Sequence, residues 1–296
     1  MAWRLAVNQN KLIREEAVIF ISKLLVATLA GLALFAFAQP GAYAATETKI
    51  DCDKGGTIQG ALDKAKNGDI ISVQGFCTEN VVILKDGIHL LADGVATIHA
   101  ANSTLETILV LGRNIAIDGF IISGGKQGIF IDNTASATIA NNQITDNTRG
   151  IIIFRASTGN IEDNVISGNG FDEDGEPIIR GHGIFIGLSS SATINRNVID
   201  ANGAVGVRFA EASSGRLSDN TITNNQTLGL DVSFNSSVRL SDGGGGPNLF
   251  EGNGGYGWQC QINSSIWPTE NQNFGTGNNL SNTNIGSSCV KAGSFN

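Results

Sequence analysis

The chain has 296 residues, with 19 Lys and Arg against 27 Asp and Glu, and 38 Gly against 4 Pro. Its formal net charge of −8 and pI near 4.9 exclude the basic surface on which nucleic-acid-binding proteins depend. The same charge would repel a polyanion at long range unless Ca²⁺ or a local cluster of arginines intervened.

Residues 1–44 are predicted to be a signal peptide. An apolar run, Leu24–Ala38, is followed by the small-x-small sequence Ala42-Tyr43-Ala44, as in a secretory leader. Four basic residues precede the run: Arg4, Lys11, Arg14 and Lys23. A retained anchor is the alternative, but the run is shorter than the ~20 residues that span a bilayer. We therefore expect a secreted or periplasmic protein, cleaved after Ala44, that leaves the membrane.

From Ile115 onward one phrase recurs every 22 to 24 residues. Each copy begins with an apolar residue, has Asn three and eight positions later, and closes on Gly–apolar–x–apolar. The Asn positions are Asn142, Asn147, Asn164, Asn169, Asn197, Asn202, Asn220 and Asn225. Insertions at Phe171–Gly181 and Gly243–Pro247 interrupt the count, and removing them restores it. A fixed period with insertions at turns indicates a solenoid.

Three short strands joined by tight turns fit one repeat. Alternation would bury Ile129 and Ile131 while Phe130 faces outward. Stacked coils would pair each strand with its copy in the next coil, so that equal positions form ladders. We interpret the Asn residues as builders of turns, since Asn tolerates left-handed conformations and its amide can bond between copies. The pattern resembles the right-handed parallel β-helix superfamily, with its pectate-lyase-like fold, over about Thr57 to Ile262.

The predicted fold class is therefore all-β: a single-stranded right-handed parallel β-helix of about seven or eight coils. Residues 45–69 would form an N-terminal cap, with an amphipathic helix inside Thr57–Lys66 that covers the first coil. The β-helix would follow over residues 70–262. Residues 263–296 would make an irregular C-terminal coil and cap.

All four cysteines lie outside the predicted leader. Export and an even count favour disulfides over a metal site. Cys52 and Cys77 bracket the predicted cap helix, and Cys260 and Cys289 bracket the last coil and the tail. Three pairings are open from the sequence, and we expect these two local ones.

The closing strand of each repeat should present one outward side chain per coil. These are Phe130, Ile152, Phe185, Arg208, Asp231 and Gln259. The apolar members would suit a groove that binds sugar rings, and the alternative is that the insertion at residues 171–181 covers them. Arg208 and Asp231 would be neighbours on adjacent strands, where an exposed ion pair contributes little energy.

The insertion at residues 171–181 concentrates acidic charge. Asp172, Asp174 and Glu176 could collect a hard cation such as Ca²⁺ through carboxylate oxygens. A solvated acidic loop is the alternative, because the spacing does not match an EF-hand. We expect no other cofactor.

The sequence Arg180-Gly-His182-Gly resembles the motif that carries a catalytic-site histidine in polygalacturonase-type glycoside hydrolases. The two opposed carboxylates that glycoside hydrolysis needs are absent from the neighbouring repeats, and a variable turn residue is the alternative for His182. A lyase or epimerase needs only a base and a group that neutralises the uronate. Arg149, Arg155 and Arg208 would lie beside the motif and suit that chemistry.

We expect an exported, monomeric β-helix that binds a polysaccharide or cell-envelope glycan along one face without turnover. A small polysaccharide lyase, epimerase or glycoside hydrolase acting on an acidic glycan is the alternative. The catalytic candidates are His182, Arg180 and Arg208. The candidates for substrate contact are Phe130, Arg149, Ile152, Arg155, Phe185 and Asp231.

Overall fold

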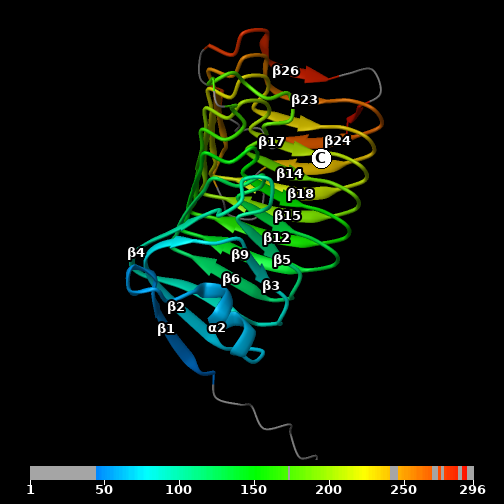
Figure 1. Cartoon of the computed structure of the whole chain (residues 1–296). Coiled ribbons are helices and arrows are strands. Elements are labelled where there is room, and N and C mark those ends of the chain that lie inside the picture. The colour runs from blue at the N-terminus through cyan, green and yellow to red at the C-terminus, as the bar shows by residue number, and fades with distance from the viewer. Residues whose placement is uncertain are drawn as a thin grey trace, which may run out of the picture. The chain divides into compact units, whose positions relative to one another are not determined.

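The computed structural model describes residues 45–172, 174–240, 246–268, 273–274, 277–285 and 289–291. The predicted leader and part of the predicted C-terminal cap lie outside these ranges. Over these described residues the chain is a parallel β-solenoid of about eight turns (Figure 1). Each full coil contributes one strand to each of three faces, and every strand pairs in parallel with its copies in adjacent coils.

The three faces are named here by their strands. The first face comprises β6 (Ile115–Asp118), β9 (Ser136–Ala140), β12 (Thr158–Glu162), β15 (Ser191–Asn195), β18 (Ser214–Ser218), β21 (Ser237–Leu240), β24 (Ser265–Pro268) and β27 (Val290–Lys291). The second comprises β7 (Ile121–Ser123), β10 (Gln143–Thr145), β13 (Val165–Ser167), β16 (Val198–Asp200), β19 (Thr221–Thr223), β22 (Leu249–Glu251) and β25 (Asn273–Phe274). The third comprises β3 (Val81–Ile83), β5 (Ile108–Val110), β8 (Ile129–Ile131), β11 (Ile151–Ile153), β14 (Ile184–Ile186), β17 (Val207–Phe209), β20 (Leu230–Val232), β23 (Tyr256–Cys260) and β26 (Ser281–Ile285).

The first coils are less regular than the rest. β1 (Glu47–Asp51) pairs with β2 (Ile70–Thr78), which pairs in turn with β4 (His89–His99). The register between β2 and β4 shifts at Val73/Gly75, so these two long strands run across the first and second faces and join them into one sheet. From β6 onward each face forms its own ladder.

Apolar side chains of all three faces fill one continuous core. On the third face Ile129, Ile151 and Ile184 stack in register, and all three are fully buried. The alternation of β8 is as predicted, with Ile129 and Ile131 inside and Phe130 half-exposed. Because one coil cannot bury both of its open ends, the core exists only through stacking.

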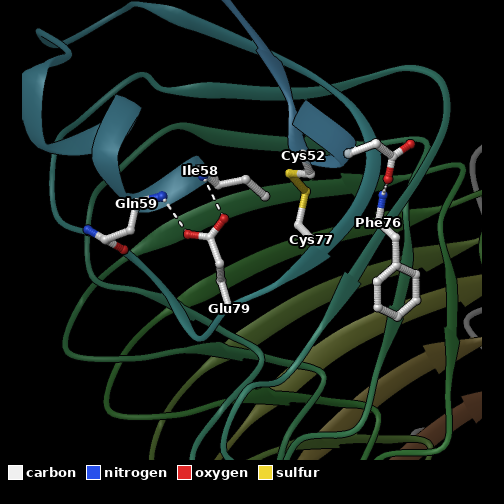
Figure 2. The surroundings of a disulfide bond; sticks show 7 residues. Cys52, Ile58, Gln59, Phe76, Cys77 and Glu79 are labelled. Carbon is white, nitrogen blue, oxygen red and sulfur yellow. Dashed lines mark hydrogen bonds between the residues drawn. A yellow bond between two sulfur atoms is a disulfide. The ribbon is translucent and has the colours of Figure 1, made fainter. Parts of the chain in front are cut away.

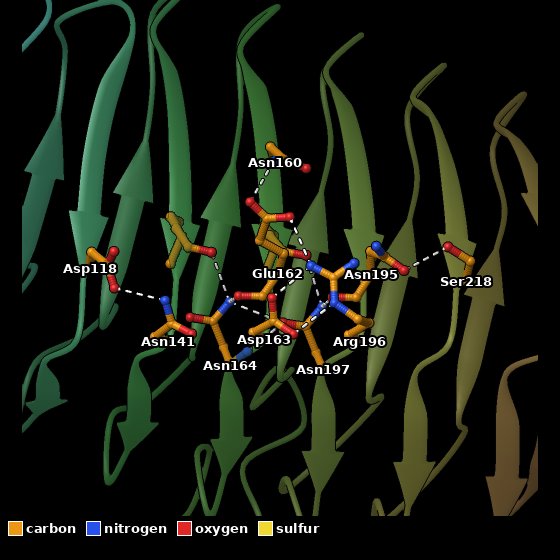
Figure 3. A network of polar contacts seen from close by, with 12 residues as sticks. Asp118, Asn141, Asn160, Glu162, Asp163, Asn164, Asn195, Arg196, Asn197 and Ser218 are labelled. Atoms are coloured by element: carbon orange, nitrogen blue, oxygen red, sulfur yellow. Dashed lines mark hydrogen bonds and ion pairs between the residues drawn. The ribbon is translucent and has the colours of Figure 1, made fainter. Parts of the chain in front are cut away.

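The Asn ladders build two of the three turns. Asn164 is typical: its Oδ1 accepts from the backbone N and the side-chain Nδ2 of Asn142 at 2.9 and 3.1 Å, and its own Nδ2 donates to the carbonyl of Ile139 at 2.8 Å. The same Nδ2 also donates to Oδ1 of Asn197, its copy in the next coil, at 3.0 Å (Figure 3). The buried Asn residues are not themselves left-handed. The preceding residue takes the positive φ instead, as at Asp163 and Arg196. Buried amides that bond from coil to coil satisfy backbone groups that a tight turn would leave unpaired.

A ladder of buried serines, which the sequence did not reveal, closes the third turn. The backbone N of Ser157 donates to Ser190 Oγ at 3.2 Å, and the N of Ser190 to Ser213 Oγ at 3.3 Å. The pattern continues through Ser236 to Ser264. From β9 to β23 each coil therefore has two Asn turns and one Ser turn.

The insertion at residues 171–181 leaves the coil through a narrow neck. An added Cβ on Gly170 would lie 2.2 Å from the Cα of Gly181, so the two backbones approach as closely as Gly permits. Beyond the neck, Ile151 and Ile184 pair in register. The insertion thus adds a loop without disturbing the ladder, as predicted.

A short helix, α2 (Ile58–Lys64), lies inside the segment predicted to be helical. It buries Ile58, Ala61 and Leu62. The carboxylate of Glu79 accepts from the first backbone N–H groups of α2, at Ile58 (2.7 Å) and Gln59 (3.0 Å) (Figure 2), which satisfies donors that a helix start leaves free. Its role as a cap stays a prediction.

Two disulfides fasten the two end regions of the solenoid. Cys52, in the short 3₁₀ helix η1 (Cys52–Lys54), is joined to Cys77 of β2, and Cys260 of β23 is joined to Cys289. The predicted pairings are confirmed. In the described parts of the chain, no helix combines the length and the apolar character required to cross a bilayer.

Candidate functional site

A pocket of about 250 Å³ opens over the third face, at the coils of β8, β11, β14 and β17. It is lined by Gln127, Phe130, Arg149, Ile152, Phe154, Arg180, His182, Phe185, Arg208, Ala210, Glu211 and Phe234. All three catalytic candidates and four of the six contact candidates line it. Arg155 and Asp231 do not.

The residues that precede the closing strands form one wall. Gln127, Arg149 and His182 occupy the same position in successive coils, as the bonds from Gly128 N to the carbonyl of Arg149 and from Gly150 N to that of His182 show. With its amide oriented to satisfy both neighbours, Gln127 donates to Glu106 at 2.8 Å and accepts from Arg149 at 3.1 Å. The turn position of the repeat therefore supplies a polar wall.

The outward side chains of the third face form an aromatic floor. Ile152 points outward but is only 2 % exposed. Phe154 packs edge-on against Phe130 and Phe185, with ring centroids 6.1 and 5.0 Å apart. Phe154, the turn residue that follows β11, thus packs against both outward Phe side chains. Of the described residues of the insertion, which the sequence offered as the alternative cover, only Arg180 lines the pocket.

Arg208 reaches the pocket above a buried carboxylate. Its guanidinium lies 5.6 Å from the centre of the Phe185 ring, and its Nε lies 3.2 Å from Asp231 Oδ2. Asp231 is only 4 % exposed and also accepts from Ser233 Oγ at 3.1 Å. The expectation of an exposed ion pair is therefore wrong. Asp231 lies beneath the site and holds Arg208 in place.

Arg155 belongs to a turn outside the pocket. It has a positive φ of 53°, and both its Nε and its NH2 bond the carboxylate of Asp132, the former at 2.6 Å. This bidentate contact links the turns of two neighbouring coils. Arg155 therefore stabilises the fold at this turn.

Arg180 is the insertion's contribution to the pocket. Its carbonyl accepts from Arg149 Nε at 3.0 Å, so the loop also orients Arg149. Asp172, one of the acidic candidates for a cation site in the same loop, forms a turn instead. Asp172 Oδ1 accepts from the backbone N of Asp174 at 3.1 Å and of Glu176 at 2.8 Å, as a turn-forming Asp does. The structure does not gather these carboxylates into a cluster among the described residues.

Burial and positive charge make His182 a neutral ring. It is 3 % exposed, and burial first, then Arg208, Arg149 and Arg180, lower the pKa of His182 from 6.5 to about 3. Its Nδ1 accepts from the backbone N of Val205 at 3.3 Å, which leaves Nε2 as the protonated nitrogen. The ring stands edge-on to Phe185, 5.5 Å away.

Several lining residues were not predicted. Phe154, Ala210, Glu211 and Phe234 follow the closing strands and line the pocket as turn residues. Their place in the sequence could have revealed them, because they follow the outward residue of a closing strand closely, as Phe154 follows Ile152 by two residues. They were not predicted because we interpreted these positions as polar turns, and large apolar residues are not typical of turns.

Comparison with known proteins places the fold in a family. A family model described as "Periplasmic copper-binding protein (NosD)" matches residues 65–243, more than half of the chain. The chain belongs to the NosD family. A curated relative, a cell surface glycoprotein of Methanothermus fervidus, is 39% identical over 122 residues, which are 40% of this chain and 20% of the relative. The chain therefore spans only about a fifth of that protein's length.

Solved structures share the fold of this NosD-family chain at low sequence identity. An alginate lyase from Paenibacillus sp. str. FPU-7 aligns with a TM-score of 0.53 at 17% identity, covering 82% of this chain and 99% of the lyase. Pectate lyase Pel9A aligns with a TM-score of 0.49 at 12% identity, covering 83% and 80%. At such identities the likeness concerns the fold alone.

Proposed function

We propose that this NosD-family chain binds an acidic polysaccharide, with one sugar unit held in the pocket over the third face. The observation that supports this is the combination of three arginines, Arg149, Arg180 and Arg208, with an aromatic floor. Guanidinium groups bind carboxylates through paired, charge-assisted hydrogen bonds, and flat apolar side chains suit the faces of sugar rings.

The same residues favour binding over hydrolysis. Of the residues that line the pocket, Glu211 is the one carboxylate, whereas glycoside hydrolysis uses two across the scissile bond. His182, with a pKa of about 3, is a weak base at neutral pH, and proton abstraction is most efficient when the pKa of the base lies near the working pH. We propose that His182 serves as an Nε2 hydrogen-bond donor to the sugar.

Binding of an acidic glycan is consistent with a protein that acts at the cell envelope. The family model is described as periplasmic, and the archaeal relative as a cell surface glycoprotein. The predicted leader has the same implication. We propose that the mature chain is exported and meets its glycan outside the cytoplasm.

Copper, named in the description of the family model, does not suit the described residues of this chain. One group of three potential ligands comes together there: Cys52, Cys77 and Glu79. The two sulfurs are joined in a disulfide, and Glu79 accepts from two backbone N–H groups of α2. Copper sites need thiolate, thioether or imidazole ligands in a set. We derive no role for the metal here.

The test begins with acidic and neutral oligosaccharides on an array, followed by calorimetry of each ligand that binds. Replacing Arg149 with Gln and Arg180 with Ala should weaken the affinity for a uronate oligosaccharide by about tenfold or more, because each variant removes a charged hydrogen bond. Arg113→Gln is the matched control, since Arg113 is an exposed arginine outside the pocket. Unchanged affinity in the double variant would place the binding elsewhere.

Incubation of the bound oligosaccharide with and without Ca²⁺ separates binding from turnover. Absorbance at the unsaturated-uronate band would identify a lyase, and new reducing ends without that absorbance would identify a hydrolase. Binding without either product is the result that we expect.

A further inference from the structure

A second groove, of about 510 Å³, lies on the first face, where the pocket does not reach. It is lined by Thr158, Ser191, Ala192, Thr193, Ser214, Gly215, Arg216, Ser237, Arg239 and Trp267. These residues come from β12, β15, β18, β21 and β24. In every coil the buried Ser turn separates this groove from the third face, as at Ser157, between Phe154 of the pocket and Thr158 of the groove.

The first face is hollowed because small residues point inward at its centre. Gly159, Ala192 and Gly215 follow one another in register on the core side. An added Cβ on Gly159 would lie 2.4 Å from Ile153 Cδ1, and one on Gly215 would lie 2.4 Å from Phe209 Cε1. The strands are therefore drawn toward the large residues of the third face, and the outer surface becomes concave.

Two outward ladders line the hollow. Thr158, Ser191, Ser214 and Ser237 form a row of hydroxyls in register, one per coil. The neighbouring row changes character along the solenoid: Thr193 pairs with Arg216, Arg216 with Arg239, and Arg239 with Trp267. At strand spacing, equal groups recur about every 4.8 Å, which gives a regular array of hydrogen-bonding groups ending in charge and an aromatic ring.

The end of the second row is suited to an anionic partner. Arg216 and Arg239 are the charged residues that line the groove, and the guanidinium of Arg239 lies 5.4 Å from the centre of a Trp267 ring. Stacking on the ring limits the freedom of Arg239. Trp267 remains 39% exposed, and an exposed tryptophan beside arginines offers an apolar surface next to anion-binding groups.

We infer that this groove is a second carbohydrate-binding surface, which takes a chain of anionic sugars lengthwise across the coils. Ser and Thr hydroxyls donate to and accept from sugar hydroxyls, Arg216 and Arg239 bind the carboxylate or sulfate groups, and Trp267 stacks on a sugar ring. The groove and the pocket have no lining residue in common, so this inference does not depend on the proposed function.

Trp267 provides its own reporter. The chain has three tryptophans: Trp258 is buried, Trp3 lies in the predicted leader, and Trp267 lines the groove. Titrating the full chain with an oligogalacturonate, and separately with a sulfated oligosaccharide of similar length, should change the tryptophan fluorescence saturably for at least one of them. In Trp267→Phe that change should be lost.

The arginines and the pocket are then tested apart. Arg216→Gln combined with Arg239→Gln should weaken the fluorescence-detected affinity by about tenfold or more, and the weakening should shrink at high salt. Arg149→Gln with Arg180→Ala, which damages the pocket, should leave the fluorescence change intact, as should the control Arg113→Gln. The same oligogalacturonate with its carboxylates reduced to alcohols should bind much more weakly. Circular dichroism checks that each variant is folded.

Four results would overturn the inference. The first is no fluorescence change with either anionic oligosaccharide, and the second is full affinity in the Arg216/Arg239 double variant. The third is equal binding of the reduced, neutral oligosaccharide. The fourth is loss of the change in the pocket variants, which would assign all binding to the third face and leave the proposed function standing without the second surface.

Discussion

At position 152 the β-strand points its side chain away from the core, yet Ile152 is buried, with Phe130 and Phe185 on either side of it in the adjacent strands. At position 231 the same outward direction gives a buried carboxylate beneath Arg208. Burial raises the pKa of Asp231, while Arg208 and Ser233 oppose the rise. The direction of a side chain on a strand is thus set locally, whereas its exposure depends on the side chains around it, including those of adjacent coils.

A charge placed in the continuous core should prevent folding. Ile153 has no exposed surface, so in Ile153→Asp a carboxylate would be buried without a partner, a cost that exceeds the stability of most domains. We expect no soluble, folded protein. Ile179→Asp is the matched control, because Ile179 is 91% exposed in the insertion, and it should fold normally. A folded Ile153→Asp protein would contradict the inward assignment of β11.

His182 should make the stability of the protein sensitive to acid. In the unfolded chain the ring gains a proton near pH 6.5, whereas in the folded protein it does so only near pH 3. The unfolded state therefore binds more protons between these values, and stability is lost as the pH falls through them. As the pH falls from 6.5 to 3, the unfolding free energy of the wild type should decrease by up to roughly 5 kcal/mol more than that of His182→Asn.

Denaturant unfolding of both proteins at several pH values measures this difference. Acidic groups, including Asp231, are present in both proteins, so their titration cancels in the comparison. A constant difference across this pH range would show that His182 is protonated as easily in the folded protein as in the unfolded chain.

At the scale of the turn, buried polar ladders join the coils in addition to the apolar core. Each buried Asn bonds to its copy in the next coil and to backbone carbonyls, while exposed contacts such as Arg196 with Asp163 and Glu162 lie over the same turns (Figure 3). Exposed ion pairs contribute little. Buried amides are costly to remove because their partners are left unsatisfied.

Asn197→Ala should therefore be strongly destabilising. It would remove the acceptor of Asn164 N and Nδ2 and the donor to the carbonyl of Ile161. We expect a loss of about 2–4 kcal/mol in the free energy of unfolding. The control is Asn160→Ala, whose half-buried amide donates to Glu162 at 3.2 Å, and which should cost under about 1 kcal/mol. Equal losses would show that the ladder adds nothing beyond an ordinary polar contact.

At the scale of the whole solenoid, each coil is stabilised by its neighbours, so the two ends are the weakest parts. Cys52–Cys77 closes a loop with a sequence separation of 25, and Cys260–Cys289 one with a separation of 29. Loops of this size correspond to about 3–4 kcal/mol in the chain-entropy model. The disulfides are placed where a stack of coils would otherwise open first.

Replacing both cysteines of one bridge with Ala should loosen the corresponding end alone. Hydrogen exchange should accelerate in β1, β2 and α2 for the Cys52/Cys77 variant, and in β23 and β24 for the Cys260/Cys289 variant. The central strands β11 and β14 should keep their protection in both. Faster exchange throughout the chain in either variant would mean that the solenoid unfolds as one cooperative unit and that its ends are not separately weak.

The repeat alone was enough to predict the stacked coils, the inward Ile rows and the insertion at residues 171–181 that leaves the ladder intact, whereas the two disulfide pairings were expected from the places of the four cysteines beside the predicted cap helix and the last coil. These features depend on period, alternation and count, which are properties of the sequence itself. The neighbourhood of Arg149, His182 and Arg208 also followed from the period. Arg149 and His182 hold equal positions in adjacent coils, one strand spacing apart, and Arg208 holds the outward position of the next strand, beside Phe185.

What the sequence did not determine is the exposure of these residues and the surfaces that they form. Ile152 is buried between Phe130 and Phe185, Asp231 contacts Arg208, and Arg155 bonds Asp132; each of these depends on how far side chains of adjacent coils reach. Gly159 and Gly215 lie against Ile153 and Phe209 of the third face, which depends on packing across the coil. A period specifies neighbours along the stack, but it carries no information on packing across the coil. The tertiary structure decided that part, because only there do residues far apart in the repeat come together, as the large ring of Phe209 does with the small Gly215.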